Sequence, residues 1–278
     1  MDAHTAAPGP TEAQQEIIGQ ARAAAAADDR IVAAWLAGSF ATGTADAYSD
    51  IDLHCAVTDT SAAWFAGHWP ELAAKITPVV HCGPVPGIAG GFAITPQWLH
   101  LDLVFHRRSE CDPAALASVR PLFDRTGELL PAAPAPVAGP AGDPYFPAAA
   151  VDLYLYFLGN LAVVLGRGEV LLAMNGAVVR RDTGLIPVML AENGVRKQDG
   201  NKRLNRYLTA SQLAFLESLP PLTASRDSVI RFDQLVAADL IARGRALADR
   251  TGARWPADYE QATTAYLRRS LGVRFGPA

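Results

Sequence analysis

The chain has 278 residues, which is enough for one large domain or two modest ones. Apolar residues make up 50% of it and charged residues 19%, as is ordinary for a soluble globular protein. The formal net charge of −4 supplies no basic field for gripping a nucleic-acid backbone, so we expect no nucleic-acid partner.

The cysteines and the apolar segments indicate a cytoplasmic protein. The three cysteines are Cys55, Cys82 and Cys111. None belongs to a CxxC pair, so neither a disulfide framework nor a zinc site is expected. Residues 1–10 lack the basic segment and apolar core of a signal peptide. The most apolar stretch, residues 151–165, is shorter than the ~20 residues that a membrane span requires, so we expect no membrane partner.

The first half of the chain mixes helix and strand signals. Residues 11–27 are predicted to form a helix, because Thr11 and Gln14 have the spacing of a capping box. Residues 31–37 form a short apolar run typical of a buried strand, which Gly38-Ser39 interrupts.

Four further strands are predicted in this half. Residues 50–57 and 98–105 alternate between polar and apolar side chains, as a strand with one buried face requires. Residues 77–81 and 91–95 give weaker strand signals. Residues 131–144 are rich in proline, which prevents both helix and sheet, so a domain boundary is expected there.

Helical periodicity dominates the second half. One apolar helix face is predicted from four residues at three- and four-residue intervals, namely Val229, Phe232, Val236 and Leu240. A second is predicted from Tyr259, Ala262, Tyr266 and Leu267. We therefore expect an α+β protein: a mixed, twisted sheet domain over residues 1–135, then a helical bundle domain over residues 145–278. The active site is expected in a cleft between them, where small-ligand sites are common.

The most informative pattern is Gly38-Ser39 followed, after ten intervening residues, by Asp50-Ile51-Asp52. Strand side chains alternate, so Asp50 and Asp52 should point to the same face. Two carboxylates there would repel each other without a counter-charge, and oxygen-only ligands favour magnesium. Gly38 permits a tight turn and the close approach of a phosphate, and Ser39 adds a hydroxyl donor.

A third carboxylate follows in a strand pattern. Asp102 is flanked by apolar residues in the run from Leu99 to Val104. An unpaired charge in such a setting is costly, and a metal shared with Asp50 and Asp52 would compensate it. Each element alone has a plainer interpretation, since an Asp-x-Asp pair is commonly a solvated strand end and Gly-Ser is commonly a turn. The combination is much more specific.

This combination resembles the signature of the DNA polymerase beta-type nucleotidyltransferase superfamily, with Asp102 in the place of its third carboxylate. The resemblance implies two Mg²⁺ ions, ATP or another NTP as co-substrate, and transfer of a nucleoside monophosphate. Asp50 and Asp52 would hold the metals, Asp102 would join one of them, and Asp102 is also a candidate proton acceptor. Glu192 is an alternative base.

The second half is similar to lincosamide nucleotidyltransferases, a branch of the antibiotic nucleotidyltransferases. The similarity lies in residues 173–176, 190–194 and 199–205. It implies a small-molecule antibiotic as acceptor, with a lincosamide first and an aminoglycoside second. Aromatic and apolar residues that we expect beside the cleft favour the less charged ligand. These residues are Tyr154, Tyr156, Phe157, Met174 and Asn175, beside Arg180 and Arg181.

Other residues have two interpretations. The densest basic group is Lys197, Lys202, Arg203 and Arg206. Lys202, expected one helical turn from Arg206, is the first choice for holding the triphosphate, and the alternative is a solvated helix face. Ser49 either helps to hold phosphates or only forms a turn. His54, His81, His100 and His106 are each interpreted as core or rim residues rather than ligands, although His100 shares a strand face with Asp102 and could lie near the site.

Two other functions remain open. The first is the same chemistry on an aminoglycoside, a biosynthetic metabolite or a protein. The second is a non-catalytic, antitoxin-like binding partner, which the presence of all three carboxylates disfavours. The nucleobase, the acceptor hydroxyl and the oligomeric state are not fixed by the sequence.

Overall fold

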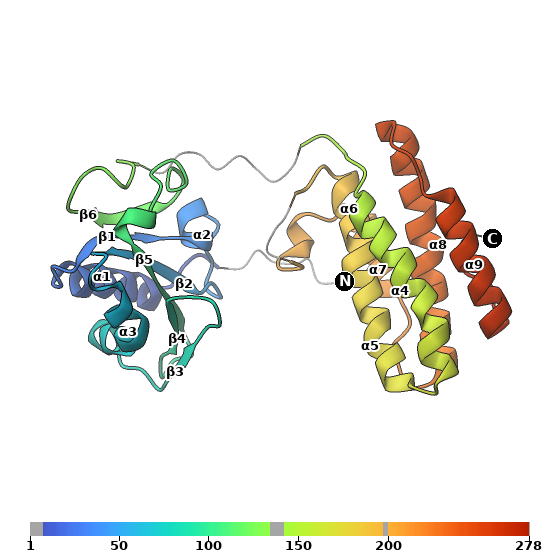
Figure 1. The fold of residues 1–278 in the computed structure, drawn as a ribbon, viewed down its shortest axis with the longest axis horizontal. Coiled ribbons are helices and arrows are strands. Elements are labelled where there is room, and N and C mark those ends of the chain that lie inside the picture. Colours follow the sequence, from blue (N-terminus) through green and yellow to red (C-terminus); the bar gives the residue numbers. More distant parts are fainter. Residues whose placement is uncertain (1–7, 134–141, 197–199, 278) are drawn as a thin grey trace. The chain divides into compact units, whose positions relative to one another are not determined.

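The computed structural model describes residues 8–133, 142–196 and 200–277 (Figure 1). The chain divides into two compact units, Met1–Ala138 and Gly139–Ala278. Each unit contains its own hydrophobic core. The first unit is built on a mixed sheet and the second from helices, which confirms the predicted α+β class.

The first unit begins with α1 (Glu12–Ala26), and its N-terminus confirms the predicted capping box. Thr11 Oγ1 accepts a hydrogen bond from the Gln14 backbone amide, and the Gln14 side chain accepts one from the Thr11 amide. The buried Gln14 amide group also donates to the carbonyl oxygens of Asp46 and Ser49, at 3.2 and 2.7 Å. The first helix therefore holds the loop that leads to Asp50.

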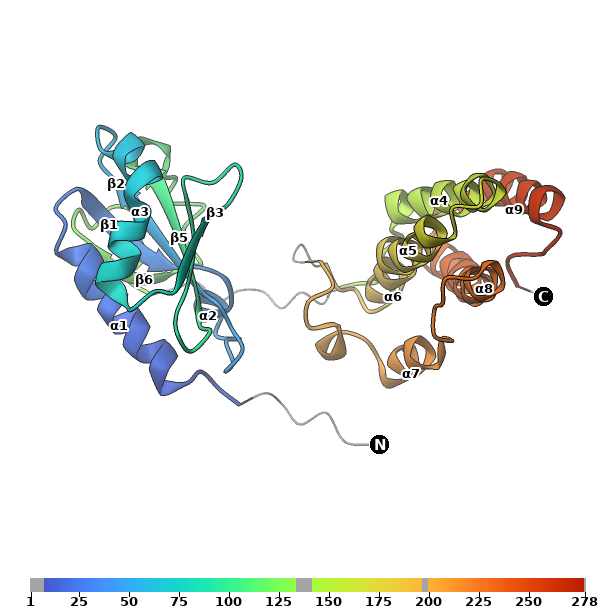
Figure 2. The same ribbon diagram turned by 90° about the horizontal axis from the view of Figure 1, so that it is seen from below.

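Six strands form one sheet in the order β3-β4-β5-β2-β1-β6. They are β1 (Ile31–Leu36), β2 (Ile51–Val57), β3 (His81–Pro84), β4 (Gly90–Ile94), β5 (His100–Arg107) and β6 (Arg120–Asp124). The central neighbours β2 and β5 are parallel, and the other pairs are antiparallel. Helices α1 and α3 (Ala62–Ile76) cover one face of the sheet (Figure 2). The core of the unit lies between them.

One strand prediction for this unit needs correction, and two elements were not predicted. The strand predicted at residues 77–81 lies later, as β3, because α3 continues to Ile76. The helix α3 itself was not predicted: it contains Gly67 and Pro70, which in a sequence indicate a turn. The edge strand β6 was not predicted either, because its five residues are all only partly buried and do not alternate.

The second unit is a bundle of helices, as predicted. It contains α4 (Ala148–Gly166), α5 (Val170–Arg180), α6 (Ile186–Glu192), α7 (Ala210–Ser218), α8 (Arg226–Thr251) and α9 (Ala257–Leu271). A π-helical turn, Arg181–Leu185, joins α5 to α6. Figure 2 looks almost along the axes of α4, α5, α8 and α9. The predicted apolar face of α8 is buried in the core of this unit.

The apolar face predicted for α9 is wrong in three of its four residues. Tyr259, Ala262 and Tyr266 are exposed, and only Leu267 is buried. The buried face of α9 includes the polar residue Glu260. The Glu260 carboxylate can be buried because it accepts hydrogen bonds from Arg245 and from the Trp255 indole. Charge pairing thus overrides the apolar pattern.

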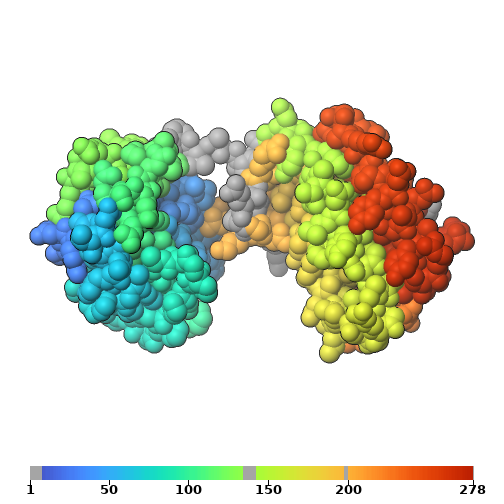
Figure 3. Space-filling view, viewed as in Figure 1, coloured from blue at the N-terminus to red at the C-terminus, as the bar shows by residue number. Residues whose placement is uncertain are grey.

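Helix α4 is the one described helix that is long and apolar enough to cross a membrane by length and composition. Core helices of soluble proteins pass the same test. Here α4 packs side by side with α9, as Figure 3 shows for the yellow-green and red surfaces, and its residues Val151, Leu155, Leu158 and Leu161 are fully buried in the core of the unit. Of the apolar window in α4, 39% is buried within the described structure, and Leu153 and Tyr156 on the same helix are exposed.

Candidate functional site

The parallel pair β2 and β5 brings acidic residues together at one end of the sheet. Asp52 is in register with Asp102, and Ile51 is in register with Leu101. Ile51 and Leu101 are buried in the core beneath α1 and α3. Because side chains alternate along a strand, Asp52 and Asp102 belong to the opposite face, where both are partly exposed.

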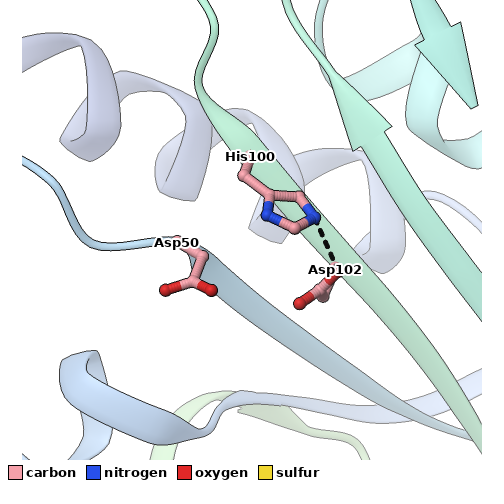
Figure 4. A group of neighbouring side chains, drawn as sticks. All are labelled: Asp50, His100 and Asp102. Carbon is pink, nitrogen blue, oxygen red and sulfur yellow. Dashed lines mark ion pairs between the residues drawn. The ribbon is translucent and has the colours of Figure 1, made fainter. Parts of the chain in front are cut away.

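Asp50, His100 and Asp102 gather around one point. Asp50 directly precedes β2, and His100 opens β5. One possible ligand atom from each of the three residues lies within 4.8 Å of the other two. Figure 4 shows the His100 ring beside the space between the two carboxylates. Two of the three predicted carboxylates are thus joined by an imidazole.

The His100 ring packs against Phe92 and lies close to the Asp102 carboxylate. Its Nε2 atom is 3.1 Å from Asp102 Oδ1. That atom is buried and forms no hydrogen bond within the described part of the chain, so the contact lacks hydrogen-bond geometry. The Phe92 ring, on β4, meets the His100 ring edge to face at a centroid distance of 5.5 Å.

Asp52 lies against Gly38, the glycine of the Gly-Ser pair. Gly38 has a φ of +55°, in the left-handed region, and a Cβ atom built on it would lie 2.1 Å from Asp52 Oδ2. The Ala37 amide donates a hydrogen bond to the Asp52 carbonyl oxygen at 3.0 Å. Only glycine therefore allows the turn after β1 to approach this carboxylate so closely.

The two serines of the predicted site have different surroundings. Ser39 lies in the short helix α2 (Gly38–Thr42), and its Oγ atom is buried without a hydrogen-bond partner among the described residues. Ser49 Oγ accepts from the Asp46 amide and donates to Asp46 Oδ1. Ser49 thus takes part in the turn next to Asp50, and the Ser39 hydroxyl has no partner among the described residues.

These residues fit a divalent cation. Carboxylate oxygens and imidazole nitrogens are ordinary ligands of such ions. Asp50, His100 and Asp102 offer one ligand atom each within 4.8 Å of the others, which is close enough for one ion to contact all three. The His100 nitrogen is buried without a hydrogen bond, which is costly for a polar atom unless something binds it.

Lys202 belongs to the helical unit and lies in an exposed turn over residues 200–203. The predicted helical spacing of Lys202 and Arg206 is wrong. Arg203 has a left-handed φ of 58°, which breaks any helix there, and only a short 3₁₀ turn, Leu204–Arg206, follows. Lys197, of the same basic group, lies outside the described residues.

Glu192, the alternative base, is engaged in the framework of the helical unit. Its Oε2 atom accepts hydrogen bonds from Arg243 and from Gln212, both at 2.8 Å. The next residue, Asn193, donates to the Tyr207 carbonyl and to Gln212 Oε1. Much of the segment 190–194 therefore holds α6, α7 and α8 together.

His54 and His106 form a stacked pair further along the same face of the sheet. His54 Nδ1 and His106 Nε2 are 2.9 Å apart, and both rings stack on the buried Trp35. Burial and the neighbouring imidazole lower the pKa of His54 to about 4. Burial also lowers the pKa of His106. The pair is therefore neutral at pH 7 and shares one proton across the contact.

This pair predicts a pH-dependent stability of the sheet unit. The ordinary pKa of His54 is 6.5 and its folded pKa is about 4, so the unfolded state takes up the proton first as pH falls. Stability should thus fall between pH 7 and 5, by about 1–2 kcal/mol from His54 alone. Urea denaturation at both pH values should show a smaller fall in His54→Gln. The exposed His68→Gln should behave like wild type, and an equal fall in all three proteins would contradict the prediction.

Comparisons with known proteins do not identify the family of this chain. No family model matches the sequence, and no curated protein is similar to it. Among solved structures, an aminoglycoside 6-adenyltransferase from Bacillus subtilis is 15% identical with a TM-score of 0.40, covering 95% of this chain and 100% of that chain. A similarity this low assigns neither a fold nor an activity.

Proposed function

We propose that this protein is a divalent-metal-dependent nucleotidyltransferase that moves a nucleoside monophosphate, AMP from ATP, onto a hydroxyl of a small molecule. The observation that carries the proposal is the position of Asp50, Asp52 and Asp102 at one end of the parallel pair β2 and β5, with the Gly38 turn packed against Asp52. A cation-binding group beside a glycine turn suits a polyphosphate substrate.

The proposed reaction is an in-line displacement. The acceptor hydroxyl oxygen forms a bond to the α-phosphorus, the bond from that phosphorus to the bridging oxygen breaks, and pyrophosphate leaves. Divalent cations held by Asp50, Asp52 and Asp102 would make the hydroxyl more acidic and neutralise the pyrophosphate. Asp102, which is partly exposed, is proposed to accept the hydroxyl proton. The Ser39 hydroxyl supplies a hydrogen-bond donor for a phosphate oxygen.

Gly38→Ala should abolish this activity, because the added Cβ would displace the Asp52 carboxylate. Gly43 offers a matched control: its φ is +70°, but a Cβ there meets nothing within 4 Å. Both variants should lose about 1–2 kcal/mol for placing alanine in the left-handed region. Thermal melts and initial rates of the two proteins separate the effects. Activity in Gly38→Ala equal to that in Gly43→Ala would disprove the importance of the Gly38–Asp52 contact.

Lys202 is proposed to offset charge on the triphosphate. If so, Lys202→Ala should raise the NTP concentration needed for half-maximal rate or slow turnover, by roughly 10²-fold. The exposed Arg226→Ala, at the start of α8, should leave the kinetics unchanged. Steady-state kinetics over a range of NTP concentrations measure both variants, and wild-type kinetics in Lys202→Ala would return the lysine to a solvated surface role.

The acceptor is proposed to be an antibiotic of the lincosamide type. Two residues that we predicted beside an acceptor cleft lie in the core of the helical unit instead. Tyr154 is fully buried, and the buried Arg180 pairs with Asp233. The proposal therefore rests on the resemblance of residues 173–176, 190–194 and 199–205 to lincosamide nucleotidyltransferases. Residue 199 lies outside the described part of the chain.

A screen of acceptors tests the function. The purified protein is incubated with a divalent cation, each NTP in turn, and lincomycin, clindamycin or an aminoglycoside, and the products are weighed by mass spectrometry. A lincosamide carrying one added AMP is the expected product. Modification of an aminoglycoside, or of the purified protein itself, instead would overturn the acceptor assignment. The absence of nucleotide transfer to every acceptor in the screen would overturn the transferase.

A further inference from the structure

We propose that His100 binds the divalent cation of this site through a ring nitrogen, and that this nitrogen makes the site prefer Mn²⁺ to Mg²⁺. The inference rests on the proposed function, since it concerns the same metal site. It also departs from the sequence-based expectation of magnesium, which assumed ligands with oxygen atoms only.

The distance between His100 and Asp102 fits two neighbouring ligands of one metal ion. Octahedral ligands at about 2.1 Å from a cation lie about 3.0 Å apart along an edge of the octahedron. His100 Nε2 and Asp102 Oδ1 are 3.1 Å apart. Asp50 contributes a third ligand atom within 4.8 Å of the others, from the neighbouring strand.

A hydrogen bond does not explain the same contact. The two atoms are close enough for one, yet His100 Nε2 is buried and has no hydrogen-bond partner among the described residues. A histidine whose role was to cap Asp102 would be oriented to donate to it. A buried nitrogen beside a carboxylate oxygen, in a contact that lacks hydrogen-bond geometry, is the arrangement that a shared cation stabilises.

The ring is also held in place on the site face of the sheet. His100 and Asp102 are two residues apart on β5, so both side chains belong to one face. Phe92, paired with Asp102 across β4 and β5, meets the His100 ring at an interplanar angle of 86°. Phe92 thus packs against one part of the His100 ring, whose side chain is otherwise 40% exposed.

The identity of the donors decides the metal preference. Mg²⁺ favours oxygen ligands, whereas imidazole suits first-row transition metals, and affinity rises from Mn²⁺ along that series. One nitrogen beside the carboxylates of Asp50 and Asp102 should therefore strengthen Mn²⁺ binding relative to Mg²⁺ binding. Replacing His100 should cost Mn²⁺ affinity and leave Mg²⁺ affinity almost unchanged.

The test is electron paramagnetic resonance of the full-length protein titrated with Mn²⁺ alone. Electron spin echo envelope modulation should show nitrogen coupled directly to the bound Mn²⁺, and labelling histidine with ¹⁵N should change that signal in the wild-type protein. In His100→Leu the coupling should disappear, and Mn²⁺ affinity should fall roughly tenfold or more while Mg²⁺ affinity, measured by competition, changes less than threefold.

Two variants separate the possible failures. The exposed His68→Leu, on α3, should keep the coupling. Asp102→Asn should weaken Mn²⁺ binding whether or not His100 is a ligand. One outcome is that Mn²⁺ binds, that Asp102→Asn weakens this binding, and that no nitrogen coupling is seen. In that case the proposed role of His100 is wrong, but the metal site stands. If no Mn²⁺ binding depends on Asp102, the proposed function and this inference both fail.

Discussion

Asp50→Asn is expected to lower turnover by roughly 10³-fold or more while the fold survives. Asp50 is one of three residues whose ligand atoms surround a single point. An amide keeps the shape of the carboxylate but loses its charge, so it holds a divalent cation poorly. Asp50 lies before β2 and is partly exposed, so an amide of the same shape is accommodated there without disturbing the core.

Initial rates and melting temperatures measured on the same preparation check this result. Asp29→Asn is the matched control, because the Asp29 side chain is 99% exposed and lies in the same unit. The control should match wild type in both measurements. Turnover near the wild-type rate in Asp50→Asn would end the assignment of Asp50 as a metal ligand.

The largest effect on stability is expected at the buried ion pair of the helical unit. Asp233 accepts two hydrogen bonds from Arg180, at 2.8 and 2.5 Å, and both side chains are at most 5% exposed. Burial raises the pKa of the Asp233 carboxyl above its ordinary value, and Arg180 offsets only part of this. Asp233→Asn would leave the Arg180 charge buried without its partner, at a cost of about 3–5 kcal/mol.

Urea denaturation of the full chain measures this cost. The exposed Asp249→Asn, on the same helix α8, should change the free energy of unfolding by less than about 0.5 kcal/mol. The double variant Arg180→Met/Asp233→Leu should recover most of the loss, because paired apolar replacements often match a buried ion pair. A loss below about 1 kcal/mol in Asp233→Asn would show that Arg180 finds water or another partner.

Strand alternation predicted much of the sheet because it reports burial directly. In β2 and β5 every second residue enters the core, so the pattern indicated both strands and the face shared by Asp52 and Asp102. The capping box at Thr11 predicted the start of α1 in the same local way. Signals of this kind depend on neighbouring residues alone, which is why a single sequence contains them.

Long-range contacts could not be predicted from the same signals. The sequence does not show that Gln14 holds the loop before Asp50, or that a Cβ on Gly38 would meet Asp52. The burial of Glu260 likewise depends on Arg245, fifteen residues away, so a search for apolar periodicity chose the wrong face of α9. His100 and Asp102 share a strand face, as the sequence indicated, but the distance of 3.1 Å between their side-chain atoms comes from the structure alone.

The central claim is that the α-phosphate of an NTP is transferred to the acceptor, and the fate of labelled ATP tests it most directly. ATP labelled at the α- or the γ-phosphate is incubated with the protein, a divalent cation and lincomycin, beside Asp50→Asn and a sample with chelator. The α-label should appear on the acceptor and the γ-label in pyrophosphate, in wild type only. Transfer of the γ-label to the acceptor, or α-label transfer that persists in Asp50→Asn or with chelator, would contradict this account.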